Sequence, residues 1–422
     1  MKKYIKNYFK NKKEELKIYG KKNLIIRLIT IVSTIVFASL IIILLTNNNY
    51  YKNKYNIDYT EIVFNRLEKA KVLEIISEEE NTNSSIAYNY HITYKALMQS
   101  GEDEGKEVIV HQYLNDYTSN YTNTVKSKQI IYVSKQASSG DTISYLFNGD
   151  SMSFDHKAGL IILSVILIIL LLIVSKTKGL LTIISLALTI LVVLFVFLPR
   201  ILIGNNIYLL TIFTCVFIVV VTYLIVVGAN KKGLCASIAC ILGLLLSGLL
   251  SIIAMSLLSV TGHYANEDIS EITLLFQSLY NVDIKINLKG IIFASTLIGA
   301  LGAVMDVSLS LSSSLKEVYD NAKETSMLKT IKSGFVIGKD MIGTMVNTLI
   351  LAYLASDMGF ILYMMVHHSN AFILRSEYIA VAIAQALVGS IAMILTIPLT
   401  SIICALVYNK KTKKGEERYE ES

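Results

Sequence analysis

The sequence is short of charge and lacks tryptophan entirely: Asp, Glu, Lys and Arg make up 17% of it, against 53% apolar residues. A soluble domain usually carries about a quarter charged residues, so the composition argues against a wholly soluble protein. Without tryptophan, tyrosine must supply any aromatic belt at a membrane surface.

Cysteine is scarce, and no signature of a common enzyme class is present. The four cysteines lie in apolar runs and lack metal-ligand spacing, so we predict neither a structural disulfide nor a cysteine metal site. The six histidines also lack such spacing, and there is no phosphate-binding glycine loop, no His-Glu-x-x-His and no Cys-x-x-Cys. We therefore expect no metal, no cofactor and no enzyme activity, although an intramembrane protease or transferase remains open. The cysteines are Cys215, Cys235, Cys240 and Cys404.

An excess of positive charge, +7 in all, could indicate a nucleic-acid partner. The lysines and arginines instead fall mostly at the ends of apolar runs, where they set the orientation of membrane helices. We expect the lipid bilayer, and not nucleic acid, as the partner.

Apolar runs near the ~20 residues that span a membrane recur along the chain. The first follows a basic N-terminus, residues 1–23, and is too long for a signal peptide, so we predict an uncleaved anchor helix. Seven to nine spans remain open, because 267–280 has the spacing of an interfacial helix and 358–366 is apolar but too short. The eight predicted spans are 24–45, 158–175, 180–198, 206–227, 234–259, 288–309, 336–356 and 378–407.

Lysines mark alternate loops between these spans. Lys176 and Lys178 occupy one short loop, Lys231 and Lys232 another, and lysines at 410–414 follow the last span, whereas the other loops carry mixed charge. By the positive-inside rule, both termini should be cytoplasmic, including the tail 408–422. Richness in Lys, Ile and Asn is typical of a low-GC bacterial genome, so we predict a bacterial cytoplasmic membrane.

Residues 46–157 form the one sizeable polar segment, which this topology places outside the cytoplasm. Short strand-like runs at 70–76, 91–98, 107–111 and 128–133, with a turn signal at 100–106, predict a small β-rich domain. The expected fold is an α-helical polytopic membrane protein of about eight helices. The β-rich domain would lie between its first and second helices, and 158–407 would form the multi-helix membrane domain.

Polar residues inside spans are costly and need partners. On one helix Asp306, Ser310, Ser313 and Glu317 share a face. A second set of small residues on this helix is expected to allow close helix packing. These packing residues are Ser295, Gly299, Gly302 and Ala303.

The next span carries a matching polar face, with Gly343 beside it as a further packing residue. Its polar residues begin at a similar predicted depth to Asp306, so the two faces could meet. The last span contains Gln385 and Pro398; the proline predicts a kink, and broken helices beside polar faces recur at solute sites. The polar residues of the second face are Asp340, Thr344, Asn347 and Thr348.

Plainer interpretations stay open for each of these residues. Asp306 could stand at a water-exposed helix end, and Asp340 could form an interfacial pair with Lys339. Serine and threonine in helices commonly bond back to the carbonyl four residues earlier. Thr344, Asn347 and Thr348 could simply hold helices together.

Two stretches resemble the YibE/F-like family of multi-pass bacterial membrane proteins: 298–307 (IGALGAVMDV) with its serine tail, and 338–353 (GKDMIGTMVNTLILAY). Residues 388–400 (VGSIAMILTIPLT) resemble the family's last helix, and the similarity extends over about 70–407. Lys339 stands where the family is expected to favour arginine, which has a planar fork. The resemblance implies a role for Asp306, Asp340 and Asn347, and a homo- or hetero-oligomer because related members occur as pairs. It implies no known activity.

Two functions follow as hypotheses. The first is a transporter or permease for an ion or small solute, with Asp306 as its titratable or ion-coordinating group. Its path would be lined by Ser310, Ser313, Asp340, Thr344, Asn347 and Thr348. The second is a non-transporting scaffold or sensor whose outer domain binds an envelope partner. Water discriminates between them, because a transport path must be hydrated and a scaffold packed dry.

Overall fold

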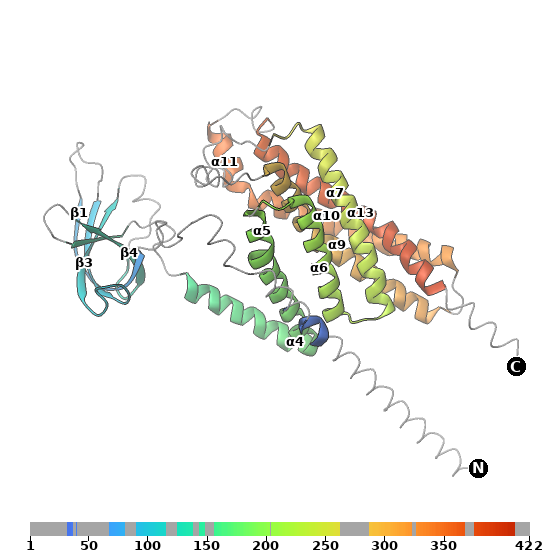
Figure 1. Ribbon diagram of the computed structural model, residues 1–422, viewed down its shortest axis with the longest axis horizontal. Helices are drawn as coiled ribbons and strands as arrows, with labels where there is room; N and C mark the ends of the chain where they lie inside the picture. Colours follow the sequence, from blue (N-terminus) through green and yellow to red (C-terminus); the bar gives the residue numbers. More distant parts are fainter. Residues whose placement is uncertain are drawn as a thin grey trace, which may run out of the picture. The chain divides into compact units, whose positions relative to one another are not determined.

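The structure is a computed structural model, and its chain divides into two compact units, residues 49–174 and residues 1–48 with 175–422 (Figure 1). Each unit is described by itself. Most of the predicted anchor helix and the predicted interfacial helix at 267–280 lie outside the described residues. The structure describes residues 32–36, 39, 67–80, 90–114, 125–137, 143–147, 156–202, 204–261, 287–322, 326–367 and 375–409.

The first unit contains a closed five-stranded barrel with strand order β1-β2-β3-β5-β4. All neighbouring strands pair antiparallel except β3 and β5, whose parallel pairing closes the barrel. The predicted β-rich domain is confirmed, and β5 is a strand that the sequence patterns did not indicate. The strands are β1 (Leu67–Glu80), β2 (Tyr90–Met98), β3 (Glu107–Leu114), β4 (Ile130–Ala137) and β5 (Ile143–Leu146).

Alternation along the strands builds the barrel core. On β2, every second residue from Ile92 to Met98 is buried, as expected for a strand with one face inward. Tyr94 fills the interior against Phe147, with ring centroids 6.2 Å apart in an edge-on arrangement. Gln112 is also fully buried, and neither polar atom of its side chain has a hydrogen-bond partner in the described part of the chain.

The turn between β2 and β3 is held by Asp103. Its carboxylate accepts hydrogen bonds from Lys106 (2.8 Å), Lys135 (3.1 Å) and the Tyr145 hydroxyl (2.5 Å), which together hold the pKa of Asp103 well below its usual range. Gly101 has φ of 94°, a conformation that glycine adopts without strain. The turn predicted at 100–106 is therefore confirmed, and Lys135 of β4 and Tyr145 of β5 connect their strands to it.

The second unit is mostly helical. Of the described helices, six are long and apolar enough to cross a membrane. The first of these runs through α4 (Lys157–Val192), a short π-helix η2 (Val193–Phe197) and α5 (Leu198–Leu202). Residues 157–174 of α4 belong to the first unit, and the rest belongs to the second. The others are α6 (Ile207–Val226), α7 (Lys231–Leu257), α9 (Leu288–Asn321), α10 (Met327–Ser356) and α13 (Glu377–Asn409).

Two predicted spans, 158–175 and 180–198, fall on the two helical stretches that meet at a kink inside α4. The backbone leaves the helical region only at Lys176, with φ of 47° and ψ of −122°. The predicted break between these spans is therefore present as a kink at Lys176, and Lys178 is already helical. The apolar stretch near 358–366 is the ten-residue helix α11 (Met358–His367), which is too short to span.

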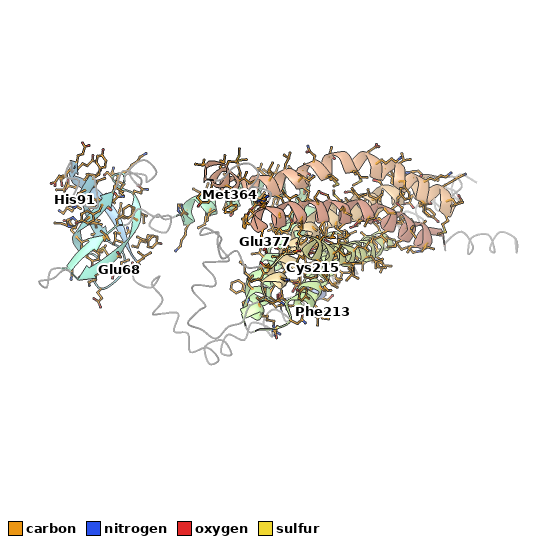
Figure 2. The ribbon with its side chains drawn as sticks, turned by 90° about the horizontal axis from the view of Figure 1, so that it is seen from above. Glu68, His91, Phe213, Cys215, Met364 and Glu377 are labelled. Atoms are coloured by element: carbon orange, nitrogen blue, oxygen red, sulfur yellow. The ribbon has the colours of Figure 1, made fainter. Side chains whose placement is uncertain are left out.

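Helices α7, α9 and α13 form the packed centre, and α6 and α10 lie against it. The two sides of α6 illustrate the division between core and outside: Phe213 is 70% exposed and Cys215 only 1% (Figure 2). At the ends of α7 and α13, the Glu377 carboxylate accepts hydrogen bonds from the backbone N–H and hydroxyl of Thr261. Helix α13 continues on both sides of Pro398, and the kink predicted there stays a prediction.

Candidate functional site

Helix α9 has one face buried and one face exposed. Val304, Val307 and Leu311 pack into the core clusters shared with α6, α7 and α13. The opposite face carries small and polar residues that recur every three or four positions, and Ser313 on it is half-buried. We call this face the α9 stripe; its exposed members are Ser295, Gly299, Gly302, Asp306, Ser310 and Glu317.

Helix α10 contacts its neighbours through glycines. A Cβ added at Gly334 would lie 2.2 Å from the Ser401 hydroxyl, and one added at Gly338 would lie 2.4 Å from Cγ2 of Ile397. Only glycine lets α10 approach α13 so closely. The polar residues predicted on α10 lie at other positions of this helix, and all of them are exposed. They are Asp340, Thr344, Asn347 and Thr348.

Two contacts set the register of α9 against α10. Gly299 lies beside the Tyr353 hydroxyl, and Gly334 lies beside Leu315. Asp306, near the middle of 299–315, therefore lies at about the level of Thr344, near the middle of 334–353. By the same reasoning Asp340 lies at about the level of Ser310, roughly one turn away from Asp306.

Most hydroxyls on these faces bond to their own helices. Ser313 donates to the Leu309 carbonyl (2.6 Å), and Thr344 and Thr348 donate to carbonyls three residues earlier. For these residues the plainer interpretation, local bonding within the helix, describes what the structure contains. In the described part of the chain, no hydrogen bond or ion pair engages the side chains of Asp306, Asp340 or Asn347, and none joins the two polar faces.

A cavity of about 830 Å³ adjoins one end of the α9 stripe. Its described lining contains no charged side chain, and its polar groups are Ser295, Tyr353, Ser356 and Gln385. Gln385 donates to the Ser295 hydroxyl (2.7 Å). The Tyr353 hydroxyl is buried and lacks a hydrogen-bond partner among the described residues. The cavity thus combines apolar walls with a few neutral polar groups, a composition typical of small-molecule sites.

The predicted packing residues divide into two groups. Gly299 does make a close contact, since a Cβ there would lie 1.9 Å from the Tyr353 hydroxyl, and Ala303 is half-buried in the core cluster of α13. Gly302 and Gly343 face open space, with nothing within 4 Å of an added Cβ. They contact no other helix in the described part of the chain, because each lies on the exposed side of its helix.

The patterns also missed polar contacts on the buried side of α9. Tyr223 of α6 contacts the Ser308 hydroxyl (2.7 Å) and donates to the Met305 carbonyl (2.8 Å), and Ser312 donates to the Lys232 carbonyl of α7 (3.0 Å). Ser308 and Ser312 are four residues apart, so helical spacing alone could have separated them from Ser310 and Ser313. No sequence pattern marks Tyr353, because its neighbours along α10 are mostly apolar.

Within the described ranges, no cluster of three or more His, Cys, Asp or Glu side chains could hold a metal ion. His91 and His111 of the barrel do contact each other, with Nε2 and Nδ1 3.0 Å apart. Burial and the neighbouring His91 lower the pKa of His111. Two imidazoles alone fall short of a closed metal site.

Comparison with known proteins supplies a family for the helical part. Residues 163–410 match the sequence profile described as YibE/F-like protein. No curated protein and no solved structure matches the chain. The matched region begins after the barrel, so it does not include the β-rich domain that the resemblance was expected to cover. Because this match covers more than half of the sequence, the chain belongs to the YibE/F-like family.

Proposed function

We propose that this protein is a membrane transporter or permease for an ion or small solute, with a path along the α9 stripe. The observation that carries the proposal is Asp306, an exposed carboxylate with no hydrogen-bond or ion-pair partner among the described residues, inside a helix apolar enough to span a membrane. A carboxylate at the centre of a span costs about 2.5–3.5 kcal/mol. Such residues commonly serve ion or proton pathways, where water or a cation offsets the cost.

The cavity supports a path longer than Asp306 alone. Ser295 and Gly299 belong both to the cavity lining and to the α9 stripe, so polar and small residues continue from the cavity to Asp306 and Ser310. The cavity offers a neutral solute the Gln385 amide and the Ser295 hydroxyl. Asp306 offers a cation or proton a site further along the same helix.

The proposed orientation places the barrel outside the cytoplasm and both termini inside, in a bacterial cytoplasmic membrane. Lys178 and Lys231 support it, since both flank apolar segments on the side that the positive-inside rule assigns to the cytoplasm. Together with the predicted anchor, this topology requires the element from α4 to α5 to cross twice. Lys176 is the residue at which the chain would turn.

The test is thiol labelling of single cysteines with membrane-impermeant reagents applied to each side in turn. Ser295→Cys, Ser310→Cys and Thr344→Cys probe the path, and Leu163→Cys, an exposed apolar position of α4, is the matched control. The wild-type protein, which has only its four buried native cysteines, serves as the blank. We expect the path positions to react from both sides and Leu163→Cys from neither.

The second candidate function is a scaffold or sensor. It is favoured by the local bonding of Ser313, Thr344 and Thr348, which engages the single donor proton of each hydroxyl within its own helix and leaves only acceptor capacity for a solute. A scaffold keeps its polar faces dry against a partner. Absence of labelling at every path position from both sides would contradict transport and support this function.

A further inference from the structure

Helix α10 carries an exposed row of residues along the side that faces neither α9 nor α13. The row repeats at intervals of four, three, four and four residues, which is the spacing of one helix face. Val336 is 64% exposed and Leu351 51% exposed, and the three members of the row between them are exposed as well. We call this row the α10 stripe; it consists of Val336, Asp340, Gly343, Asn347 and Leu351.

Lipid alone is a poor occupant for this stripe. Hydrocarbon offers no hydrogen bonds, so an amide or a carboxylate in a membrane span needs a protein or water partner. Asn347 lies well inside the span, and no described residue pairs with it. Gly343 adds an open backbone surface, of the kind that lets a second helix approach closely.

We propose that the α10 stripe is the contact surface for a second copy of this chain, related by a two-fold axis along the membrane normal. Two copies insert in the same orientation, so each stripe residue meets its own counterpart at the same depth. An asparagine amide is both donor and acceptor, so Asn347 can pair with the second copy's Asn347. A polar residue that pairs across a seam of this spacing also sets the register of the two helices.

The charges on α10 are self-complementary in the same arrangement. Lys339 and Asp340 are both exposed, and neither forms an ion pair within the described part of the chain. Across a parallel two-fold contact, the lysine of each copy can reach the aspartate of the other. The interface would also lie at the depth of Asp306, which is level with Thr344 on the neighbouring helix. The proposal does not depend on transport, because it follows from the unsatisfied polar groups alone.

Oxidative cross-linking in native membranes tests the proposal. Two differently tagged copies carrying Gly343→Cys or Asn347→Cys are co-expressed; Gly343 has open space for the new side chain. The wild-type protein, with its four buried cysteines, is the blank, and Leu163→Cys, 66% exposed on α4, is the matched control. We expect a product containing both tags at the stripe positions and none at Leu163→Cys.

Other occupants give different outcomes. A product of another mass carrying one tag would identify a different protein, and no product would point to cover by the same chain; either overturns the proposal. A second measurement compares self-association in detergent. Asn347→Ala should weaken it roughly 3- to 10-fold, the range for an interhelical hydrogen bond in a membrane. Thr348→Val should leave it unchanged, because Thr348 donates to its own helix. Equal weakening by both variants would also overturn the proposal.

Discussion

The first half of α4 and the outer side of α10 are both exposed, yet their surfaces differ in chemistry. In the most apolar 18-residue stretch of α4 no residue is buried, and the exposed side chains there are nearly all Leu, Ile and Val. In the most apolar 18-residue stretch of α10 almost no residue is buried either, but the exposed side chains of this helix include Asp340, Thr344 and Asn347. Lipid satisfies the first surface completely and the second only in part. An exposed helix surface can therefore face lipid or await a polar partner, and its polar side chains distinguish the two cases.

The comparison breaks if α4 tolerates a charge as well as α10 does. Leu167, near the middle of the first half of α4, is 51% exposed, and Leu167→Asp should cost about 2.5–3.5 kcal/mol of insertion free energy. The cost arises because lipid cannot solvate the carboxylate. Glycosylation mapping of the α4 segment in microsomes measures the inserted fraction. Asn347→Asp in the α10 segment, already polar there, is the control and should lower insertion less; equal losses would contradict the comparison.

Two glycines on opposite sides of α10 sharpen the comparison. Gly338→Ala should lower the stability of the detergent-solubilised protein by about 1–3 kcal/mol, because the new methyl group collides with Ile397 of α13. Gly343→Ala, on the exposed side, should not lower the unfolding midpoint, because the new methyl group meets open space and alanine favours a helix more than glycine does. Thermal unfolding of the two variants under identical conditions provides the measurement. A larger loss at Gly343 than at Gly338 would mean that the two faces of α10 had been assigned the wrong way round.

The smallest expected effect lies in the barrel, where an unsatisfied amide is enclosed. Gln112→Leu should raise the stability of the barrel by about 1 kcal/mol, because it removes two buried polar atoms without a partner. Leucine has a similar size, so the core should stay filled. Chemical denaturation followed by barrel tyrosine fluorescence reports the change. Destabilisation by Gln112→Leu would show that the amide has a partner, and it would weaken the same reasoning about Asn347.

Much of the architecture could be predicted from local patterns. Alternation located β1 to β4, because a strand with one buried face repeats every two residues. The strand β5 escaped prediction because four residues carry too little pattern, and its parallel partner β3 is remote in sequence. The apolar runs located the long helices from α6 to α13. They could not show that the two helices of α4 meet at a one-residue kink at Lys176, since a charged residue marks a loop and a kink equally well.

The candidate site shows the same division. Helical spacing placed Asp306 and Ser310 on one face, and Asp340 and Asn347 on another, because residues three and four apart share a side of any helix. Spacing could not decide what each face meets. Only the packing of α9 and α10 showed that both faces are exposed, that most hydroxyls bond locally, and that Tyr353 lines a cavity.

The sequence by itself determined that this protein has membrane-like helices and a β-rich domain, and it identified the polar residues inside its spans. Those properties depend on residue type and periodicity, which are local. The tertiary structure alone decided the closure of the barrel, the register of α9 against α10, and which glycines contact α13. Those properties depend on contacts between residues far apart in the chain, and a one-dimensional pattern does not specify which surfaces meet.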